Sequence, residues 1–216
     1  MRRRRLPAPA VVAGAWLAGS VPFAHIAARR RGVDLRQQGR GTVSGSALYE
    51  VAGFGPLAAA GLCDVGKGAV GPLLAGRDRP VLAAVAATAG MAGHNWSPWL
   101  GGAGGRGVSV ALGALTTQAW PGTVVLAVGL AAGRLSRQTG LGTLVAAVAL
   151  VPVVARTHGR GAALAGAGLA GTMIAKRLAG NHPPAEPGWA TYAHRLLFDH
   201  DPAPRPGRPA ALREAA

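Results

Sequence analysis

The chain has 216 residues, which suits a single domain, and half of them are hydrophobic while only 14% are charged. Its net charge is +15, but the basic residues stand at the ends of apolar runs, as in the loops of membrane proteins, and do not form a groove-reading helix. The composition therefore argues against a water-soluble domain and against nucleic acid as a partner, and the single Cys63 excludes an intramolecular disulfide.

Long charge-free runs give the strongest indication of fold. Residues 6–28, 80–100, 107–133 and 138–155 contain no Lys, Arg, Asp or Glu. An apolar run of about 18 residues or more is typical of a transmembrane helix. We therefore predict an all-α, polytopic membrane helix bundle with about seven transmembrane segments and three polar, glycine-rich loops on one face. The expected helical segments are 7–29, 46–63, 64–76, 80–99, 106–119, 121–136 and 140–156, followed by an apolar stretch at 159–180.

Two of these segments have alternative interpretations. The pieces at 46–63 and 64–76 are alternatively one bent or broken element. The start of the chain, with Arg2–Arg5 before an apolar run, is also the pattern of a secretory signal peptide. That run is long for a signal peptide and the chain after it is itself apolar, so we interpret it as a retained first helix.

The chain changes character near Asn181, where proline and charged residues become frequent. Such a composition cannot bury a core. We predict a membrane domain over residues 1–182 and a flexible, proline-rich tail over 183–216, in which WATYAHRLLF is a candidate for a short interfacial helix.

Three polar segments interrupt the apolar pattern, at residues 32–53, 63–68 and 93–109. Each combines glycines with a basic residue, and glycine-rich turns leave backbone N–H groups free to bind an anion such as phosphate. The spacing in GGAGGRG differs from that of a Walker loop, and GRGTVSG follows an expected membrane helix, not a strand. The three loops therefore predict a phosphate-bearing substrate handled at a membrane surface.

Three stretches of the chain, taken in order, carry a family resemblance: GSVPFAHIAARRRGVDLRQQGRG, CDVGKGAVGPLLAG and GHNWSPWLGGAGGRGVSVALG. They resemble the bacterial acyl-phosphate-dependent glycerol-3-phosphate acyltransferases, over about residues 14 to 180. The resemblance implies transfer of a fatty acyl group from acyl phosphate to the 1-hydroxyl of glycerol 3-phosphate, which gives lysophosphatidic acid for phospholipid synthesis. The implied partners are these two substrates and membrane lipid, with no cofactor and no metal. The implied location is the bacterial cell membrane, with several passes and the polar loops toward the cytoplasm.

The resemblance also implies a set of site residues. Catalytic roles fall to His94, Arg106 and Lys67. Substrate binding falls to Ser20, Arg36, Gly39, Arg40, Gly41, Ser46, Asp64, Gly68, Gly104, Gly105, Gly107 and Arg137. Cations and backbone donors are needed because two phosphate-bearing substrates repel each other and must be held side by side.

Several of these residues have an alternative, structural interpretation. Arg36 is alternatively a positively charged anchor beside the membrane. Asp64 and Lys67 lie one helical turn apart and are alternatively a local ion pair. His94 is alternatively a helix-end residue within an aromatic belt, and Ser20 alternatively bonds its own helix backbone.

The sequence departs from the family pattern at informative positions. Arg106 replaces a lysine and Arg40 a serine, and Ala170 and Met173 align with a histidine and an asparagine of the last helix. We therefore expect weak or altered acyl transfer, which Ala170→His with Met173→Asn should raise. The alternatives are a family member that binds phosphorylated lipid precursors without turnover, and a small membrane transporter.

Overall fold

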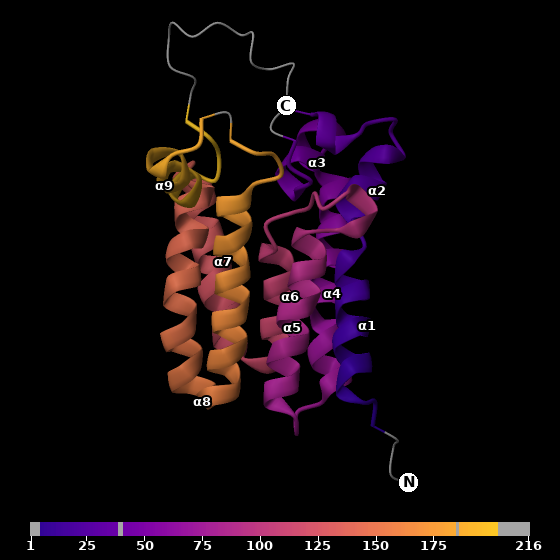
Figure 1. The fold of residues 1–216 in the computed structure, drawn as a ribbon, viewed down its shortest axis with the longest axis vertical. Helices are drawn as coiled ribbons and strands as arrows, with labels where there is room; N and C mark the ends of the chain where they lie inside the picture. Colours follow the sequence, from indigo (N-terminus) through magenta and orange to yellow (C-terminus); the bar gives the residue numbers. More distant parts are fainter. Residues whose placement is uncertain (1–4, 39–40, 185, 203–216) are drawn as a thin grey trace, which may run out of the picture.

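The computed structural model describes residues 5–38, 41–184 and 186–202, and every regular element in these ranges is helical (Figure 1). The α-helices are α1 (Ala8–Ser20), α2 (Phe23–Arg29), α3 (Gly45–Ala52), α4 (Phe54–Ala75), α5 (Pro80–Asn95), α6 (Val108–Gln118), α7 (Trp120–Leu135), α8 (Thr139–Ala179) and α9 (Trp189–Phe198). Two short 3₁₀ helices, η1 (Leu35–Gln37) and η2 (Pro98–Leu100), lie in the loops.

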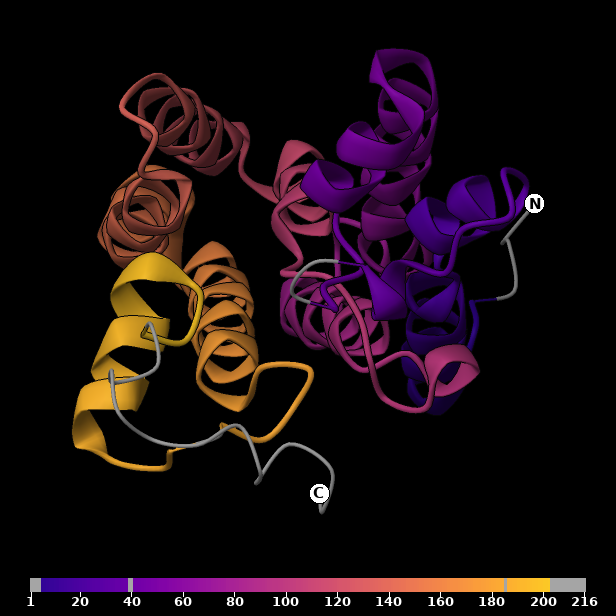
Figure 2. The ribbon, with the colours of Figure 1, turned by 90° about the horizontal axis from the view of Figure 1, so that it is seen from above.

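The long helices run side by side and alternate in direction (Figure 1). Helix α8 is two antiparallel arms joined at Gly159, whose φ of 75° is non-helical. Together with α1, α4, α5, α6 and α7, these arms give the described chain seven bundle segments, the number expected. The set differs, because the stretch at 159–180 supplies one of them and only α4 of the second and third expected segments is a long helix. Seen from above, α7 and α8 form one group and α1 to α6 another, and α8 also packs on α5 (Figure 2).

Three helical segments of the described chain are long and apolar enough to cross a membrane, judged by length and composition: Ala8–Arg29, Phe54–Ala75 and Thr139–Ala179. Helices α6 and α7 are apolar but shorter. Large apolar side chains such as Leu62, Leu73 and Val128 point outward and are more than half exposed, as expected for a surface that contacts lipid. The expected all-α membrane bundle is confirmed.

Two expected helix boundaries were wrong. The break between the second and third expected segments lies at Gly53, not after Cys63, so Asp64 and Lys67 belong to the middle of the continuous helix α4. Gly53 has a φ of 77°, a left-handed conformation that glycine adopts without strain. The first expected segment is also interrupted, because Val21 and the N-cap Pro22 leave the helical conformation between α1 and α2.

Helices α4 and α6 touch backbone to backbone. A Cβ on Gly68 would lie 2.1 Å from the carbonyl oxygen of Val110, and one on Gly113 would lie 1.8 Å from that of Val65. Only glycine permits this reciprocal approach, as in other closely packed membrane helices. Gly68, expected to bind substrate, therefore has a packing role in the structure, and the contact fixes the start of α6 beside Asp64.

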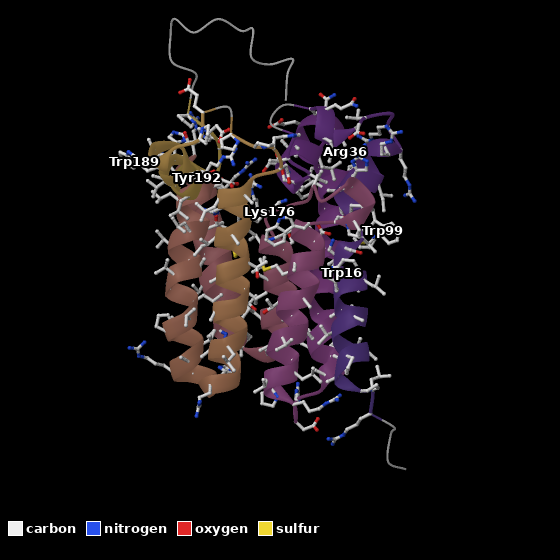
Figure 3. The ribbon with its side chains drawn as sticks, in the orientation of Figure 1. Trp16, Arg36, Trp99, Lys176, Trp189 and Tyr192 are labelled. Carbon is white, nitrogen blue, oxygen red and sulfur yellow. The ribbon has the colours of Figure 1, made fainter. Side chains whose placement is uncertain are left out.

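Part of the expected tail packs on the bundle. Helix α9 coincides with the predicted interfacial segment and lies across the ends of the two arms of α8, with Trp189 86% exposed (Figure 3). Residues 203–216 lie outside the described residues. The packed body of the protein thus extends at least to residue 202.

The α4–α6 contact predicts that alanine substitutions at two neighbouring glycines have opposite effects on stability. Gly68→Ala should lower the free energy of unfolding by about 1–3 kcal/mol, because the added methyl group would overpack the interface. Gly66→Ala is the matched control, since a methyl group there would meet no described atom within 4 Å and alanine is the better helix former. Thermal unfolding of both variants in the same detergent measures the difference. Equal melting temperatures would contradict the contact.

Candidate active site

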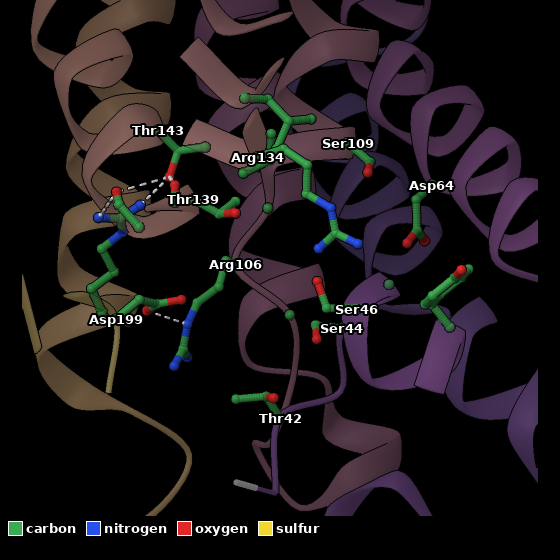
Figure 4. A pocket seen from close by; sticks show the side chains of 18 of the residues that line it. Thr42, Ser44, Ser46, Asp64, Arg106, Ser109, Arg134, Thr139, Thr143 and Asp199 are labelled. Carbon is green, nitrogen blue, oxygen red and sulfur yellow. Dashed lines mark hydrogen bonds and ion pairs between the residues drawn. The ribbon is translucent and has the colours of Figure 1, made fainter. Parts of the chain in front are cut away.

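A cavity of about 790 Å³ opens at the end of the bundle that carries α2, α3 and α9. It lies between α3, α4 and α6 on one side and α7, α8 and the end of α9 on the other (Figure 4). Its polar wall includes the residues Thr42, Ser44, Ser46, Asp64, His94, Arg106, Ser109, Arg134, Arg137, Gln138, Thr139, Thr143, Arg177, Asp199 and His200. Its apolar wall includes Leu57, Leu112 and Leu130.

Arg106 reaches the cavity from the glycine-rich loop before α6. Its Nε lies 2.7 Å from Oδ1 of Asp199 (Figure 4). Its Nη1 is buried and has no hydrogen-bond partner among the residues that the structure describes. A buried guanidinium donor without a partner is costly unless a ligand supplies an acceptor. Arg106 is therefore the strongest candidate for a phosphate-binding cation in this cavity.

The N-terminus of α6 adds backbone donors to the same wall. Gly107, the N-cap residue, has a φ of 78° and turns the loop so that Val108 and Ser109 begin the helix at the cavity. No side chain from the described ranges caps this helix end. The first N–H groups of a helix and its dipole favour an anion at such a position. The expected role of Gly107 in shaping an anion site is therefore compatible with its geometry.

His94 ends α5 and lies against the same loop. A Cβ on Gly105 would lie 2.3 Å from its Nε2, and one on Gly104 would lie 2.3 Å from its carbonyl oxygen. His94 and Gly105 both line the cavity. These two glycines thus let the imidazole reach the cavity wall, which His94 and Arg106 both line.

Asp64 and Lys67 form an ion pair within α4, with Nζ of Lys67 2.8 Å from Oδ1 of Asp64. The Lys67 ammonium also donates to the carbonyl oxygen of Val21 at 2.6 Å and lies over the Phe23 ring. Asp64 lines the cavity, whereas Lys67 lies outside its wall. Lys67 therefore links α4 to the start of α2 and positions Asp64.

Arg36 lies at the same end of the bundle but outside the cavity wall (Figure 3). Its guanidinium binds both carboxylate oxygens of Asp34, at 3.1 and 2.7 Å, and the Asp34 side chain caps η1. These hydrogen bonds hold the pKa of Asp34 well below its usual range. The arrangement makes Arg36 part of a loop-stabilising pair.

Ser20 is fully buried and lies outside the cavity wall. Its hydroxyl donates to the carbonyl oxygen of Leu17 and accepts from Nε1 of Trp99. Ser97 donates to the carbonyl oxygen of Ser20 at 2.7 Å. In the structure this residue therefore joins the end of α1 to the η2 loop.

The loop between η1 and α3 is described only in part, because the expected site residues Gly39 and Arg40 lie outside the described residues. Gly41 has a φ of 64°, and Ser44 caps α3 by accepting from the N–H of Ala47. Ser46, on the first turn of α3, lines the cavity as expected.

Asn181 joins the two glycine-rich loops, a role that the sequence did not suggest; the third expected polar loop, 63–68, is part of helix α4. The Oδ1 of Asn181 accepts from the N–H of Gly104, and its Nδ2 donates to the carbonyl oxygens of Gly41 and Gly104. The amide thus ties both glycine loops to the end of α8. Its position at the expected start of a flexible tail hid this role in the sequence.

The α7–α8 side of the cavity supplies further arginines. Arg137, expected from the sequence, and Arg134, which its sequence position suggests only as a loop anchor, both line the wall. Arg177 is buried and donates to the carbonyl oxygens of Gly140 and Leu196 and to the Thr143 hydroxyl. These contacts give Arg177 a structural role, whereas Arg134 is exposed on the cavity wall and is therefore accessible to a ligand.

The two residues of the second arm of α8 that depart from the family pattern lie in the apolar core. Ala170 and Met173 are 6% and 1% exposed and belong to the cluster that includes Met91, Val110 and Leu115. Neither lines the cavity. Lys176, one turn further on, is fully buried with its Nζ over the Trp96 ring and 3.4 Å from the carbonyl oxygen of Gly102.

The family model for glycerol-3-phosphate acyltransferase matches residues 9–182. The chain belongs to this family. Curated relatives of that name include proteins of Synechococcus sp. (strain CC9902), 39% identical over 109 residues, and Shouchella clausii (strain KSM-K16), 36% identical over 113 residues. These alignments cover 49% and 50% of this chain and 54% and 55% of the relatives, so the chain spans about half the length of the curated relatives it matches.

Two crystal structures of PlsY (YgiH), an integral membrane glycerol 3-phosphate acyltransferase, share this fold with TM-scores of 0.72 and 0.70. One is its glycerol 3-phosphate form and the other its lysophosphatidic acid form. They are 24% and 23% identical to this chain, cover 79% of it, and are themselves covered over 88% and 87% of their length. The expected family resemblance and membrane location are both confirmed.

The Asp34–Arg36 pair predicts a pH-dependent contribution to stability. Because the folded-state pKa of Asp34 is lowered, its stabilising effect is complete above the unfolded pKa of about 3.9 and is lost as the pH falls through the folded value. Asp34→Asn keeps a capping side chain but removes the charge. The variant should therefore melt below the parent from pH 5 to 8, and the difference should begin to shrink as the pH falls below about 4. A difference in melting temperature between parent and variant that stays the same at every pH would exclude the ionic contribution.

Proposed function

We propose that this protein transfers a fatty acyl group from acyl phosphate to the 1-hydroxyl of glycerol 3-phosphate and so forms lysophosphatidic acid for phospholipid synthesis. The observation that carries the proposal is the buried Nη1 of Arg106, unpartnered within the described ranges, in a cavity that also presents the start of α6, His94 and Asp64. Membership of the glycerol-3-phosphate acyltransferase family supports the same reaction.

The proposed reaction exchanges one acyl–oxygen bond for another. The 1-hydroxyl oxygen of glycerol 3-phosphate attacks the carbonyl carbon of acyl phosphate, and the bond from that carbon to the phosphate oxygen breaks. The leaving phosphate keeps the electron pair of that bond and accepts the hydroxyl proton. Since acyl phosphate is already activated, the protein contributes orientation and neutralisation of charge.

The cavity residues have complementary roles in this proposal. Arg106 and the N–H groups at the start of α6 bind one phosphate group, while Arg134 and Arg137 line the opposite wall and balance the charge of the second. His94 lies where it can hold the hydroxyl during attack. Lys67 acts through Asp64, since its ammonium binds that carboxylate and lies outside the cavity wall. The apolar wall of Leu57, Leu112 and Leu130 suits the start of an acyl chain.

We propose the bacterial plasma membrane as the location, with the cavity facing the cytoplasm. Helix-end arginines on the cavity side, Arg29 to Arg31, favour that side as the inner one. Arg5 lies at the other end of the bundle, where it pairs with Asp78 at 2.5 Å. The two groups favour opposite orientations, and we choose the cavity side because both proposed substrates are cytoplasmic anions.

Binding without turnover is the second candidate function, because Ala170 and Met173 replace two polar residues of the family pattern. Their burial in the apolar core, away from the cavity, weakens that candidate. The transporter alternative receives no support from the family match.

Arg106 provides the direct test of the proposed site. Arg106→Ala should weaken glycerol 3-phosphate binding by about 1.5–3 kcal/mol, the usual contribution of a hydrogen bond to a charged group. Arg156→Ala is the matched control, because Arg156 is exposed at the other end of the bundle and donates there to the carbonyl oxygen of Pro152. Calorimetric titration and phosphate release from palmitoyl phosphate, both in micelles, measure binding and turnover. Unchanged binding by Arg106→Ala would refute the assignment of this site.

The double variant Ala170→His with Met173→Asn tests whether the family departures limit turnover. The sequence alone led us to expect faster turnover, but the structure reverses that expectation. An imidazole and an amide in this apolar core should cost roughly 1–3 kcal/mol of stability for each unsatisfied group. We expect a lower melting temperature and no gain in the initial rate of phosphate release. A faster, equally stable variant would show that these positions face the reacting groups.

A further inference from the structure

The end of α9 contributes to the cavity although it lies beyond the region that the family model matches. That match ends at residue 182, whereas Phe198, Asp199 and His200 line the cavity wall. We call residues 189–202 the strap. The strap therefore brings an acidic side chain into a cavity otherwise rich in arginine.

Asp199 makes the closest charged contact in this part of the cavity. Its Oδ1 lies 2.7 Å from Nε of Arg106, and the two side chains are only 25% and 15% exposed (Figure 4). Arg177 lines the same cavity wall. A carboxylate bound to a guanidinium group occupies the kind of position that a phosphate oxygen takes at an arginine.

The strap is anchored independently of this contact. The buried Arg195 donates to the carbonyl oxygens of Leu178 and Ala179 at the end of α8 and to that of His182. Arg195 also pairs with Asp201, and this contact lowers the pKa of the Asp201 carboxyl. Loss of the Asp199 contact alone should therefore leave the strap attached to α8.

We propose that Asp199 is an internal anion that occupies the Nε edge of the Arg106 guanidinium, and that a phosphate group must displace it to bind this edge as well as Nη1, which is unpartnered among the described residues. The proposal rests on the proposed function, because it takes Arg106 as the phosphate ligand. A carboxylate and a phosphate repel each other and compete for the same guanidinium donors. The strap thereby lowers the affinity of the cavity for every phosphate-bearing ligand.

Inorganic phosphate is the probe that tests this competition without any requirement for turnover. Calorimetric titration uses the full chain in micelles, as the parent, as Asp199→Asn and as Asp78→Asn. The last variant is the matched control, since it removes one carboxylate from an exposed ion pair at the other end of the bundle. We expect Asp199→Asn to bind phosphate about three- to thirtyfold more tightly, and Asp78→Asn to bind like the parent.

Arg106 must carry the gain if the proposal is correct. In the Arg106→Ala background, Asp199→Asn should therefore produce no increase in phosphate affinity. A gain that persists without Arg106 would overturn the proposal. Equal or weaker phosphate binding by Asp199→Asn in the parent background would also overturn it, and weaker binding would identify Asp199 as a residue that positions Arg106.

Phosphate release from palmitoyl phosphate in the presence of glycerol 3-phosphate separates this inference from the proposed function. If no variant releases phosphate but Asp199→Asn still gains affinity through Arg106, the acyl transfer assignment fails and the internal anion stands. If the parent turns over normally and Asp199→Asn gains no affinity, the internal anion fails and acyl transfer stands. Circular dichroism of each variant verifies that the helices are retained.

Discussion

The backbone contact between α4 and α6 is the constraint on which the cavity depends. Gly68 and Gly113 allow the two helices to approach more closely than any side chain would permit. The contact sets the height of α6 relative to Asp64, and so determines where Gly107 turns and where Arg106 enters the cavity. The close packing of these helices thus determines where the polar groups lie at the end of the bundle.

The polar loops are held by a small number of buried hydrogen bonds. Asn181 joins Gly41 to Gly104, and Lys67 joins α4 to the chain that follows α1. Each bond crosses a long interval of sequence: Asn181 restrains both glycine loops, and Lys67 restrains the chain between α1 and α2. In a low-dielectric environment such bonds are strong and their loss is costly. The N–H groups of Gly41, Gly104 and Gly105 are themselves used in hydrogen bonds, so the expectation that the glycine turns leave these groups free for an anion is wrong at these positions.

The fold could be predicted from the sequence because long charge-free runs have few alternatives to membrane helices. The meeting of the glycine loops at one face was also foreseeable from their positions between those runs. The helix break at Gly53 was not foreseeable, because the sequence does not distinguish a glycine needed for a positive φ from one needed for close helix packing. The roles of Gly68 and Lys67 depend on what faces them across the bundle, which motif spacing does not encode. Asn181 and Asp199 were missed because their surroundings have the composition of a tail, and only tertiary contacts show that they belong to the packed body.

The antiparallel turn at Gly159 determines at which end of the bundle the strap lies. It adds an arm to the described bundle, so that residue 5 and the strap lie at opposite ends of the bundle. Of these two segments, the strap is the one at the cavity end. A kinase, protease or binding protein that modifies the strap could then influence the cavity directly, whereas the same event near residue 5 would take place at the far end of the bundle.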